Sequence, residues 1–254
     1  MTRRSPFSLE GRTALVTGAN TGIGQGIALA LAEAGATIVA AGRSDMSETL
    51  GLIEAAGASA VPLQLDLQQP GSAAKAIASA VAAAGPLDIL VNNAGIIRRS
   101  DALDFSEADW DEVMNLNLKA AFFLSQAFAK AALAAGRSAR IVNIASLLSF
   151  QGGIRVASYT ASKSGLAGLT KLLACEWAAK GINVNAIAPG YIETNNTQAL
   201  RADPERSTAI LARIPAARWG QASDIGGAAV FLASDAAAYM HGAILPVDGG
   251  WLAR

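Results

Sequence analysis

Cysteine and histidine are almost absent from this chain of 254 residues, in which Cys175 and His241 are the only representatives of their types. A single cysteine excludes a disulfide within the chain and fits a reducing compartment, so we expect a cytoplasmic protein. The same scarcity argues against a metal site built from His and Cys, and we expect no metal. Cys175 itself is expected in the core, on a helix that follows Lys163.

Charged residues are scarce as well, since Asp, Glu, Lys and Arg make up 16% of the chain, against about 25% in an average globular protein. The 20 basic residues balance the 20 acidic ones, which argues against a nucleic acid or an anionic membrane as partner. The uncharged window 13–32 contains polar residues and four glycines, so it predicts a strand, a turn and a helix, not a membrane span. Hydrophobic residues reach 52%, enough for the core of a single domain over 1–254.

Apolar runs of strand length alternate along the chain with longer helical patterns. This alternation predicts an α/β fold of βαβ units, with a parallel sheet covered by helices on both faces. The expected strands are 13–17, 36–41, 60–65, 87–91, 140–145, 182–187 and 243–246. Helices are expected to begin near Gly22, Ser47, Gly71, Glu107, Ser158 and Ser223.

One polar segment, at about 190–220, interrupts the alternation. Ligands of open α/β sheets bind outside the carboxyl ends of the strands, where such an insertion after a strand would lie. We interpret the segment as a substrate lid, and a surface excursion without function is the alternative.

A glycine-rich stretch follows the first expected strand, with Gly18, Gly22 and Gly24 in the spacing G-x-x-x-G-x-G. Glycines at such a turn allow the backbone to approach a pyrophosphate, which is then bound by the N-terminus of the following helix. The spacing differs from the common G-x-G-x-x-G, and glycines occur in many turns. The position between a buried strand and a helix favours a dinucleotide site.

The end of the second strand bears on the choice of cofactor. An acidic residue there would bind the 2′-hydroxyl of NAD, whereas an arginine favours the 2′-phosphate of NADP. This chain has Gly42 at the expected acidic position, followed by Arg43, Ser44 and Asp45. Arg43 favours NADP, and the sequence leaves the choice between NAD and NADP undecided.

Polar residues also follow the third and fourth strands, at the same predicted edge of the sheet as the glycine loop. Asp66 and Leu67 follow the third strand, and the run Asn-Asn-Ala-Gly at 92–95 follows the fourth. Asp66 is either a loop cap or a contact to the adenine of a cofactor.

A tyrosine and a lysine four residues apart, Tyr159 and Lys163, predict acid–base chemistry. On a helix this spacing places both side chains on one face, about 5–6 Å apart at Cβ. A neighbouring ammonium favours the phenolate form of a tyrosine, which could then exchange a proton with an alcohol or a carbonyl. Ser146 follows the fifth strand, and Asn117 is an amide inside an apolar helical pattern. Asn117 could also be a structural buried amide, and the Tyr–Lys pair could be an exposed pair.

Together these motifs resemble the short-chain dehydrogenase/reductase family, in family order and over nearly the whole chain. The resemblance implies a Rossmann doubly wound sheet of about seven parallel strands, with Tyr159 as acid/base and Ser146 as anchor of the substrate oxygen. It also implies that Lys163 binds the nicotinamide ribose, that Asn117 holds a relay water, and that the enzyme is a homotetramer built through the helices of Asn117 and Tyr159. The cofactor-binding residues expected are Gly18, Asn20, Thr21, Gly22, Ile23, Gly24, Arg43, Ser44, Asp66, Leu67, Asn93, Ala94, Gly95, Tyr159, Lys163, Pro189, Gly190, Ile192 and Thr194.

Three stretches, 93–99, 146–155 and 195–201, resemble more narrowly the family members that act on keto-deoxy sugar acids of the 2-dehydro-3-deoxy-D-gluconate or 2-deoxy-D-gluconate type in uronate degradation. Those members usually use NAD(H). We give this expectation slightly more weight than the preference for NADP that Arg43 indicates. A sugar acid carries a carboxylate, which a guanidinium binds well. The expected substrate residues, beside Ser146 and Tyr159, are Arg99, Gln151, Arg155 and Asn196.

Two other functions are weighed against this interpretation. A 3-oxoacyl-carrier-protein reductase would share every catalytic residue but normally has a basic patch for its acidic carrier protein. A non-catalytic cofactor-binding regulator would typically have lost Ser146, Tyr159 or Lys163, and this chain has all three.

Overall fold

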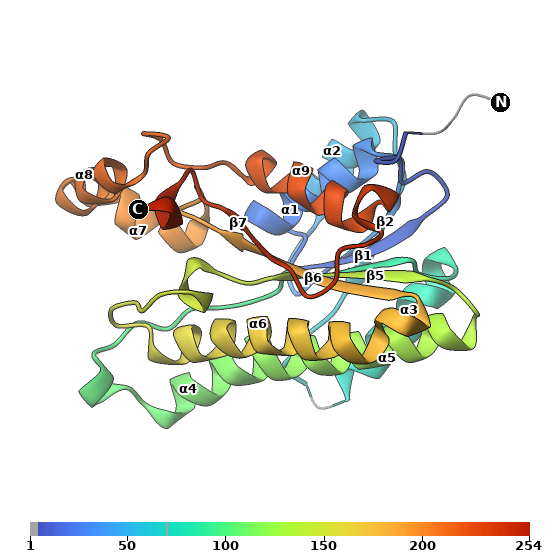
Figure 1. The fold of residues 1–254 in the computed structure, drawn as a ribbon, viewed down its shortest axis with the longest axis horizontal. Coiled ribbons are helices and arrows are strands. Elements are labelled where there is room, and N and C mark those ends of the chain that lie inside the picture. The colour runs from blue at the N-terminus through green and yellow to red at the C-terminus, as the bar shows by residue number, and fades with distance from the viewer. Residues whose placement is uncertain (1–4, 70) are drawn as a thin grey trace.

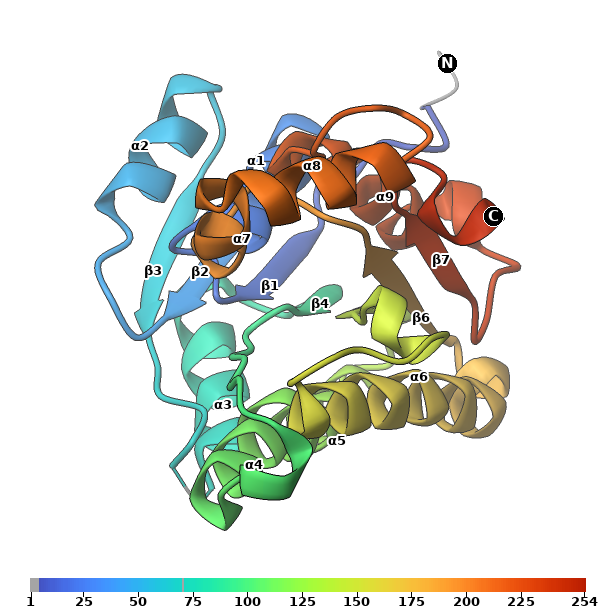
Figure 2. The same cartoon turned by 90° about the vertical axis from the view of Figure 1, so that its left-hand side faces the viewer.

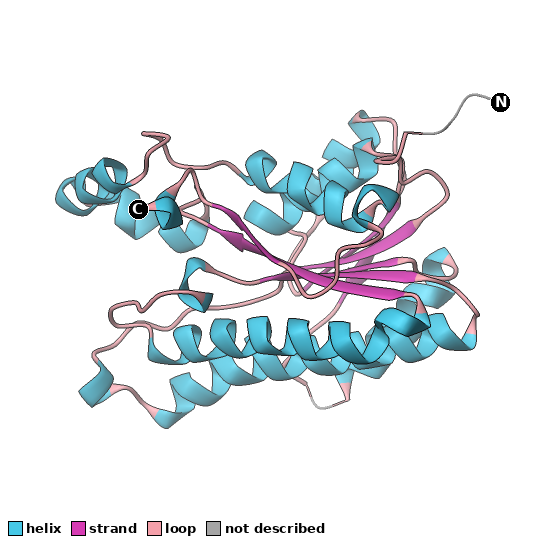
Figure 3. Cartoon of the chain, in the orientation of Figure 1, coloured by secondary structure: helices cyan, strands magenta, loops and turns pink. Residues whose placement is uncertain are grey.

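The computed structural model describes residues 5–69 and 71–254, and its centre is one parallel sheet of seven strands in the order β3-β2-β1-β4-β5-β6-β7 (Figures 1 and 3). This confirms the predicted fold class. All seven strands begin and end within two residues of the expected ranges, and the largest differences are at the start of β4 and the end of β6. They are β1 (Thr13–Thr17), β2 (Thr37–Gly42), β3 (Ala60–Gln64), β4 (Ile89–Asn92), β5 (Ala139–Ile144), β6 (Ile182–Pro189) and β7 (Ile244–Val247).

Helices cover both faces of the sheet, α1, α2 and α9 on one side and α3, α4, α5 and α6 on the other (Figures 1 and 2). Their bounds are α1 (Gly22–Glu33), α2 (Ser47–Ala55), α3 (Ser72–Ala84), α4 (Glu107–Met114), α5 (Ala121–Ala134), α6 (Ala157–Trp177), α7 (Gln198–Ala202), α8 (Pro204–Arg213) and α9 (Ala222–Ala233). No helix in the described ranges is long and apolar enough to cross a membrane.

Two hydrophobic cores lie on opposite sides of the sheet because successive strand residues point to opposite faces. In β1, Ala14 and Val16 pack into the core that includes α1 and α9, while Leu15 packs into the core that includes α3, α5 and α6. Both faces are covered, which explains why the strands read as continuous apolar runs.

The sheet has a topological switch point between β1 and β4, which are neighbours in space although two strands separate them in sequence. In open α/β sheets the crevice outside the carboxyl ends of the strands at this point binds ligands. Thr17, Asn92, Ile144 and Pro189 end β1, β4, β5 and β6 at this edge.

Three local features differ from the sequence-based expectations. Cys175 is exposed, so its prediction as a core residue is wrong; the buried face of α6 at this level is formed by Leu173 and Ala174, and Cys175 lies beside it. The single helix expected from Glu107 is divided into α4, a π-helical segment (Asn115–Ala120) and α5. The polar segment 190–220 contains α7 and α8, which lie on the same side of the sheet as α1 and α9 (Figure 2).

Candidate active site

The turn between β1 and α1 needs glycine for two different reasons. Gly18 and Gly22 have φ angles of 64° and 58°, a region that side-chain-bearing residues rarely adopt. A Cβ on Gly24 would lie 2.1 Å from the carbonyl oxygen of Gly18, so α1 can begin this close to the strand only without a side chain. The turn therefore brings backbone N–H groups to the sheet edge.

The N-terminus of α1 has no side-chain cap, since its N-cap residue Thr21 makes no capping hydrogen bond. The first N–H groups of a helix have no partner within the helix, and with the helix dipole they form an anion site. Asn93 holds this turn in place, because its Nδ2 donates to the carbonyl oxygens of Thr17 (2.9 Å) and Gly18 (3.1 Å). The arrangement fits a dinucleotide pyrophosphate.

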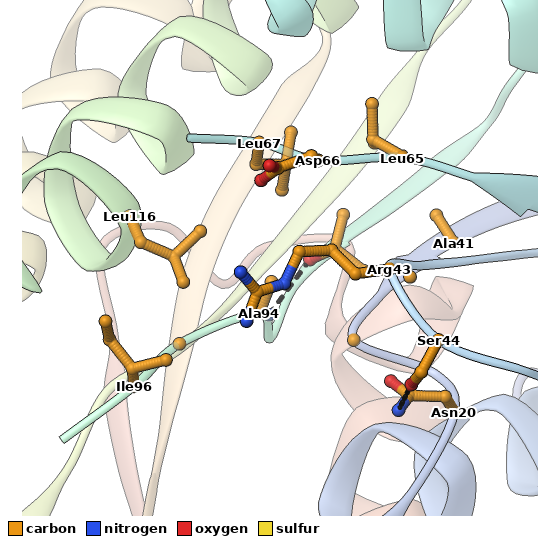
Figure 4. A pocket seen from close by; sticks show the side chains of 14 residues that line it. Asn20, Ala41, Arg43, Ser44, Leu65, Asp66, Leu67, Ala94, Ile96 and Leu116 are labelled. Atoms are coloured by element: carbon orange, nitrogen blue, oxygen red, sulfur yellow. Dashed lines mark hydrogen bonds between the residues drawn. The ribbon is translucent and has the colours of Figure 1, made fainter. Parts of the chain in front are cut away.

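Beside this turn lies a cavity at the ends of β2 and β3 (Figure 4). Arg43 extends into it. The Nη1 atom of Arg43 donates to Oε1 of Gln68 at 3.2 Å. On another side, Nδ2 of Asn20 donates to Oγ of Ser44 at 2.6 Å. Asp66 lines the cavity, and its Oδ1 caps its own loop by accepting from the backbone N–H of Gln68. Its contact to the adenine of a cofactor stays a prediction.

A second cavity continues from the glycine turn to α6 and the segment after β6. Every expected cofactor-binding residue lines one of these two cavities. The second cavity is lined by Gly18, Asn20, Thr21, Gly22, Ile23, Gly24, Asn93, Ala94, Gly95, Ile144, Ala145, Ser146, Tyr159, Lys163, Pro189, Gly190, Ile192, Thr194, Asn195, Asn196 and Thr197.

Tyr159, Lys163 and Ser146 meet in the second cavity. The first two lie one turn apart on α6, and Nζ of Lys163 is 5.6 Å from the centroid of the Tyr159 ring. Ser146 follows the end of β5, and its side chain hydrogen-bonds the Tyr159 side chain. The predicted cluster is therefore brought together, by the helix spacing on one side and by the sheet edge on the other.

Burial dominates the electrostatics of this cluster. It raises the pKa of Tyr159, while the Ser146 hydrogen bond and the charge of Arg99 act in the opposite direction. It lowers the pKa of Lys163 to about 8. Nζ of Lys163 donates to the carbonyl oxygen of Ile144 at 2.6 Å, and the positive charge of Arg99 favours the phenolate form of Tyr159.

Asn117 lies behind the cavity in the π-helical segment and is only 1% exposed. Its Oδ1 accepts from the N–H of Ile96 and its Nδ2 donates to the carbonyl oxygen of Ile96, both at 2.9 Å. Its Nδ2 also reaches Oγ of Ser162 on α6, the helix that carries Tyr159 and Lys163, at 3.4 Å. π-helical turns occur frequently at functional sites.

A third cavity opens from Ser146 and Tyr159 towards α7 and α8. Arg99, Gln151 and Asn196 line it, as expected for substrate residues. Arg155 does not line it: the Arg155 guanidinium turns to Asp101, with Nε 3.5 Å from Oδ1. The structure therefore does not bring Arg155 together with the other substrate candidates.

The sequence analysis did not predict several residues that line this third cavity, among them two aromatic and two basic ones, Tyr191, Trp251, Arg206 and Arg213. A signal exists for the two arginines, because Arg206, Ile210 and Arg213 are spaced as neighbours on one helix face. That signal needs a helix over 204–213, and the segment was interpreted as a lid in which no helix was expected. No group of three His, Cys, Asp or Glu residues able to hold a metal is found in the described part of the chain.

Comparison with known proteins places the chain in a family. The family model described as enoyl-(acyl carrier protein) reductase, a short-chain dehydrogenase/reductase model, matches residues 18–252. The chain belongs to the short-chain dehydrogenase/reductase family. Its curated relatives include the 2-dehydro-3-deoxy-D-gluconate 5-dehydrogenases of Escherichia coli strain K12, 59% identical over 98% of this chain and 99% of the relative, and of Bacillus subtilis strain 168, 57% identical over 98% and 97%.

A solved structure resembles this short-chain dehydrogenase/reductase over its whole length. It is named provisionally as a 2-deoxy-D-gluconate 3-dehydrogenase from Agrobacterium tumefaciens with bound NADP, and it is 68% identical. The TM-score is 0.95, and the match covers 99% of this chain and 100% of that one. The family and fold predictions are therefore confirmed.

Proposed function

We propose that this protein transfers a hydride reversibly between NAD(P) and a keto-deoxy sugar acid of the 2-dehydro-3-deoxy-D-gluconate or 2-deoxy-D-gluconate type. The observation that carries the proposal is that the second and third cavities share lining residues. Ser146 and Tyr159 line both the cavity of the glycine turn and the cavity that holds Arg99. A dinucleotide and an anionic substrate can thus meet at the same hydroxyl groups, and the names of the relatives agree with this substrate class.

The chain's own residues supply proton transfer and orientation. Tyr159 Oη gives its proton to the carbonyl oxygen during reduction and takes it back during oxidation. The Ser146 hydroxyl donates to the same substrate oxygen and stabilises its developing charge. Lys163, protonated at neutral pH with a pKa of about 8, binds the nicotinamide ribose, and Asn117 positions the relay water. The bound nicotinamide supplies or accepts the hydride.

The first cavity supports binding of NADP as well as NAD. Arg43 extends into it and offers a guanidinium to a 2′-phosphate (Figure 4). The nearby carboxylate of Asp45 instead accepts hydrogen bonds from Ser47, at 2.7 Å from its hydroxyl. The pyrophosphate would lie at the N-terminus of α1, and Thr194 would contact the nicotinamide carboxamide.

Three further proposals concern the domain organisation, the location and the oligomeric state of the protein. We propose one domain with a lid over about 190–220, a cytoplasmic location, and a homotetramer formed through the faces of α5 and α6. Exposed apolar side chains on those helices support the tetramer: Phe123 is 45% exposed and Leu172 is 48% exposed. The single cysteine supports the location.

An absorbance screen at 340 nm tests the function. NADH and NADPH would each be combined with keto-deoxy sugar acids and with an acetoacetyl thioester. We expect turnover of the sugar acids, and we expect Tyr159→Phe to reduce kcat by at least about 10²-fold while the cofactor still binds.

The other outcomes separate the alternative functions. Faster turnover of the thioester would assign the protein as a 3-oxoacyl-carrier-protein reductase. Cofactor binding without turnover of any compound would favour the regulator. Undiminished activity of Tyr159→Phe would refute the assigned acid/base.

A further inference from the structure

The charged side chains that line the third cavity are all positive. Its lining includes three arginines, Arg99, Arg206 and Arg213, and no Asp or Glu. Arg206 and Arg213 make no side-chain hydrogen bond or ion pair to any residue in the described ranges, whereas Arg98, Arg137 and Arg218 each pair with a carboxylate. Three exposed guanidinium groups around one cavity create a positive potential that attracts an anionic ligand.

Helix α8 carries its two arginines, both exposed, on the side that also bears the buried residue Ile210. Arg206 and Arg213 are separated by two turns, with Ile210 between them on the same side. Ile210 is buried and packs with Leu147 and Trp251. The N-terminus of the helix is capped, because the side chain of its N-cap residue, Asp203, accepts hydrogen bonds from the N–H groups of residues 205 and 206. The arginines therefore face the cavity from a fixed helix.

Arg213 is further oriented by an aromatic side chain. Its Cζ lies 4.1 Å above the Trp251 ring, and the Trp251 indole N–H donates to Oε1 of Gln151 at 3.2 Å. A guanidinium stacked on an indole keeps its in-plane N–H groups free for a planar, bidentate acceptor such as a carboxylate.

Tyr191 also lines the third cavity, beside Trp251. Its ring lies 4.7 Å from that of Trp251. Burial raises the pKa of Tyr191, and the charges of Arg213 and Arg206 both act to lower it. The charges of both arginines therefore reach Tyr191, and all three side chains line the same cavity.

We propose that Arg206 and Arg213 bind the substrate carboxylate, while Ser146 and Tyr159 hold the oxygen that reacts. The proposal rests on the function proposed above and names two residues that determine its specificity. The substrate then lies along the cavity, its carboxylate against α8 and its carbonyl or hydroxyl group at Tyr159. A neutral sugar would leave the two guanidinium charges uncompensated, and this is how the enzyme selects acids.

The test compares 2-deoxy-D-gluconate with its neutral amide, with NADP⁺ as oxidant. For Arg206→Ala and Arg213→Ala we expect kcat/KM for the acid to fall about 10- to 100-fold, mainly through KM. With the amide it should change less than about twofold. Arg254→Ala is the matched control, since Arg254 donates to the carbonyl oxygen of Ala212 on α8 but does not line the cavity. It should leave the acid-to-amide ratio unchanged.

Calorimetric titration of 2-deoxy-D-gluconate into the NADPH complex gives a second measurement, and the two alanine variants should weaken this binding by a similar factor. Arg206→Lys and Arg213→Lys should give intermediate ratios, because the charge stays and the bidentate geometry is lost. Equal losses with acid and amide would overturn the proposal and assign α8 a purely structural role. Variants that oxidise the acid with the same kcat/KM as the wild-type protein would also overturn it. Failure of the wild-type protein to oxidise any sugar acid would refute the proposed function itself.

Discussion

Replacing Lys163 by methionine should abolish turnover and yet leave the folded protein at least as stable at neutral pH. Lys163 is 4% exposed, and burial lowers its pKa from 10.5 to about 8. Between these two pH values the unfolded chain binds the proton and the folded chain does not, so the stability of the wild-type protein rises with pH across this window. Below about pH 8 the folded protein carries a buried charge that destabilises it.

The magnitude follows from the pKa values. At about 1.36 kcal/mol for each pH unit by which a pKa is displaced, the Lys163 charge costs the folded state about 3.4 kcal/mol at pH 7 and about 1.4 kcal/mol at pH 9.5. Methionine has a similar length and no charge, but it leaves the Ile144 carbonyl without the 2.6 Å hydrogen bond, at a cost of about 1–3 kcal/mol. We therefore expect Lys163→Met to be up to about 2 kcal/mol more stable at pH 7.

Urea unfolding at fixed protein concentration measures the free energy of unfolding of the wild-type protein and of the variant at each pH. The lost hydrogen bond and the changed packing contribute equally at every pH, so the test is the pH dependence. Relative to wild type, the variant should lose about 2 kcal/mol between pH 7 and pH 9.5. Lys180→Met, at an exposed position, is the control and should change stability by less than about 0.5 kcal/mol. A stability difference that stays constant or grows with pH would refute this account of Lys163.

Two further predictions concern the cofactor site. Arg43→Ala should raise KM for NADPH about 10- to 100-fold and leave KM for NADH within about twofold, as steady-state kinetics would show; equal effects on both cofactors would remove Arg43 from 2′-phosphate recognition. Gly24→Ala places a methyl group 2.1 Å from the Gly18 carbonyl oxygen, so it should cost about 1–3 kcal/mol of stability and weaken NADPH binding measured by cofactor fluorescence. Unchanged binding and stability would show that the turn is looser than described.

The agreement between sequence and structure is best where the signal is local. The i to i+4 spacing of Tyr159 and Lys163 defines a shared face as soon as α6 forms. The glycine turn and the residues after β3, β4, β5 and β6 gather for a similar reason, because parallel strands all end at one edge of the sheet.

The disagreements occur where side-chain direction depends on segments distant in sequence. Cys175 is exposed because α6 buries the neighbouring face against the sheet. Arg155 turns to Asp101 instead of the cavity. Arg206 and Arg213 reach the cavity only because α8 packs on Trp251, nearly forty residues later in the chain.

From the sequence by itself, the order of strands and helices, the dinucleotide loop and the Ser146–Tyr159–Lys163 cluster can all be deduced, since turn chemistry and the periods of strand and helix act over a few residues. Only the tertiary structure decides which arginines face the substrate cavity and which of them acts on Tyr159. Those choices depend on how loops and lid helices pack against elements far away along the chain, and no short-range pattern encodes that packing.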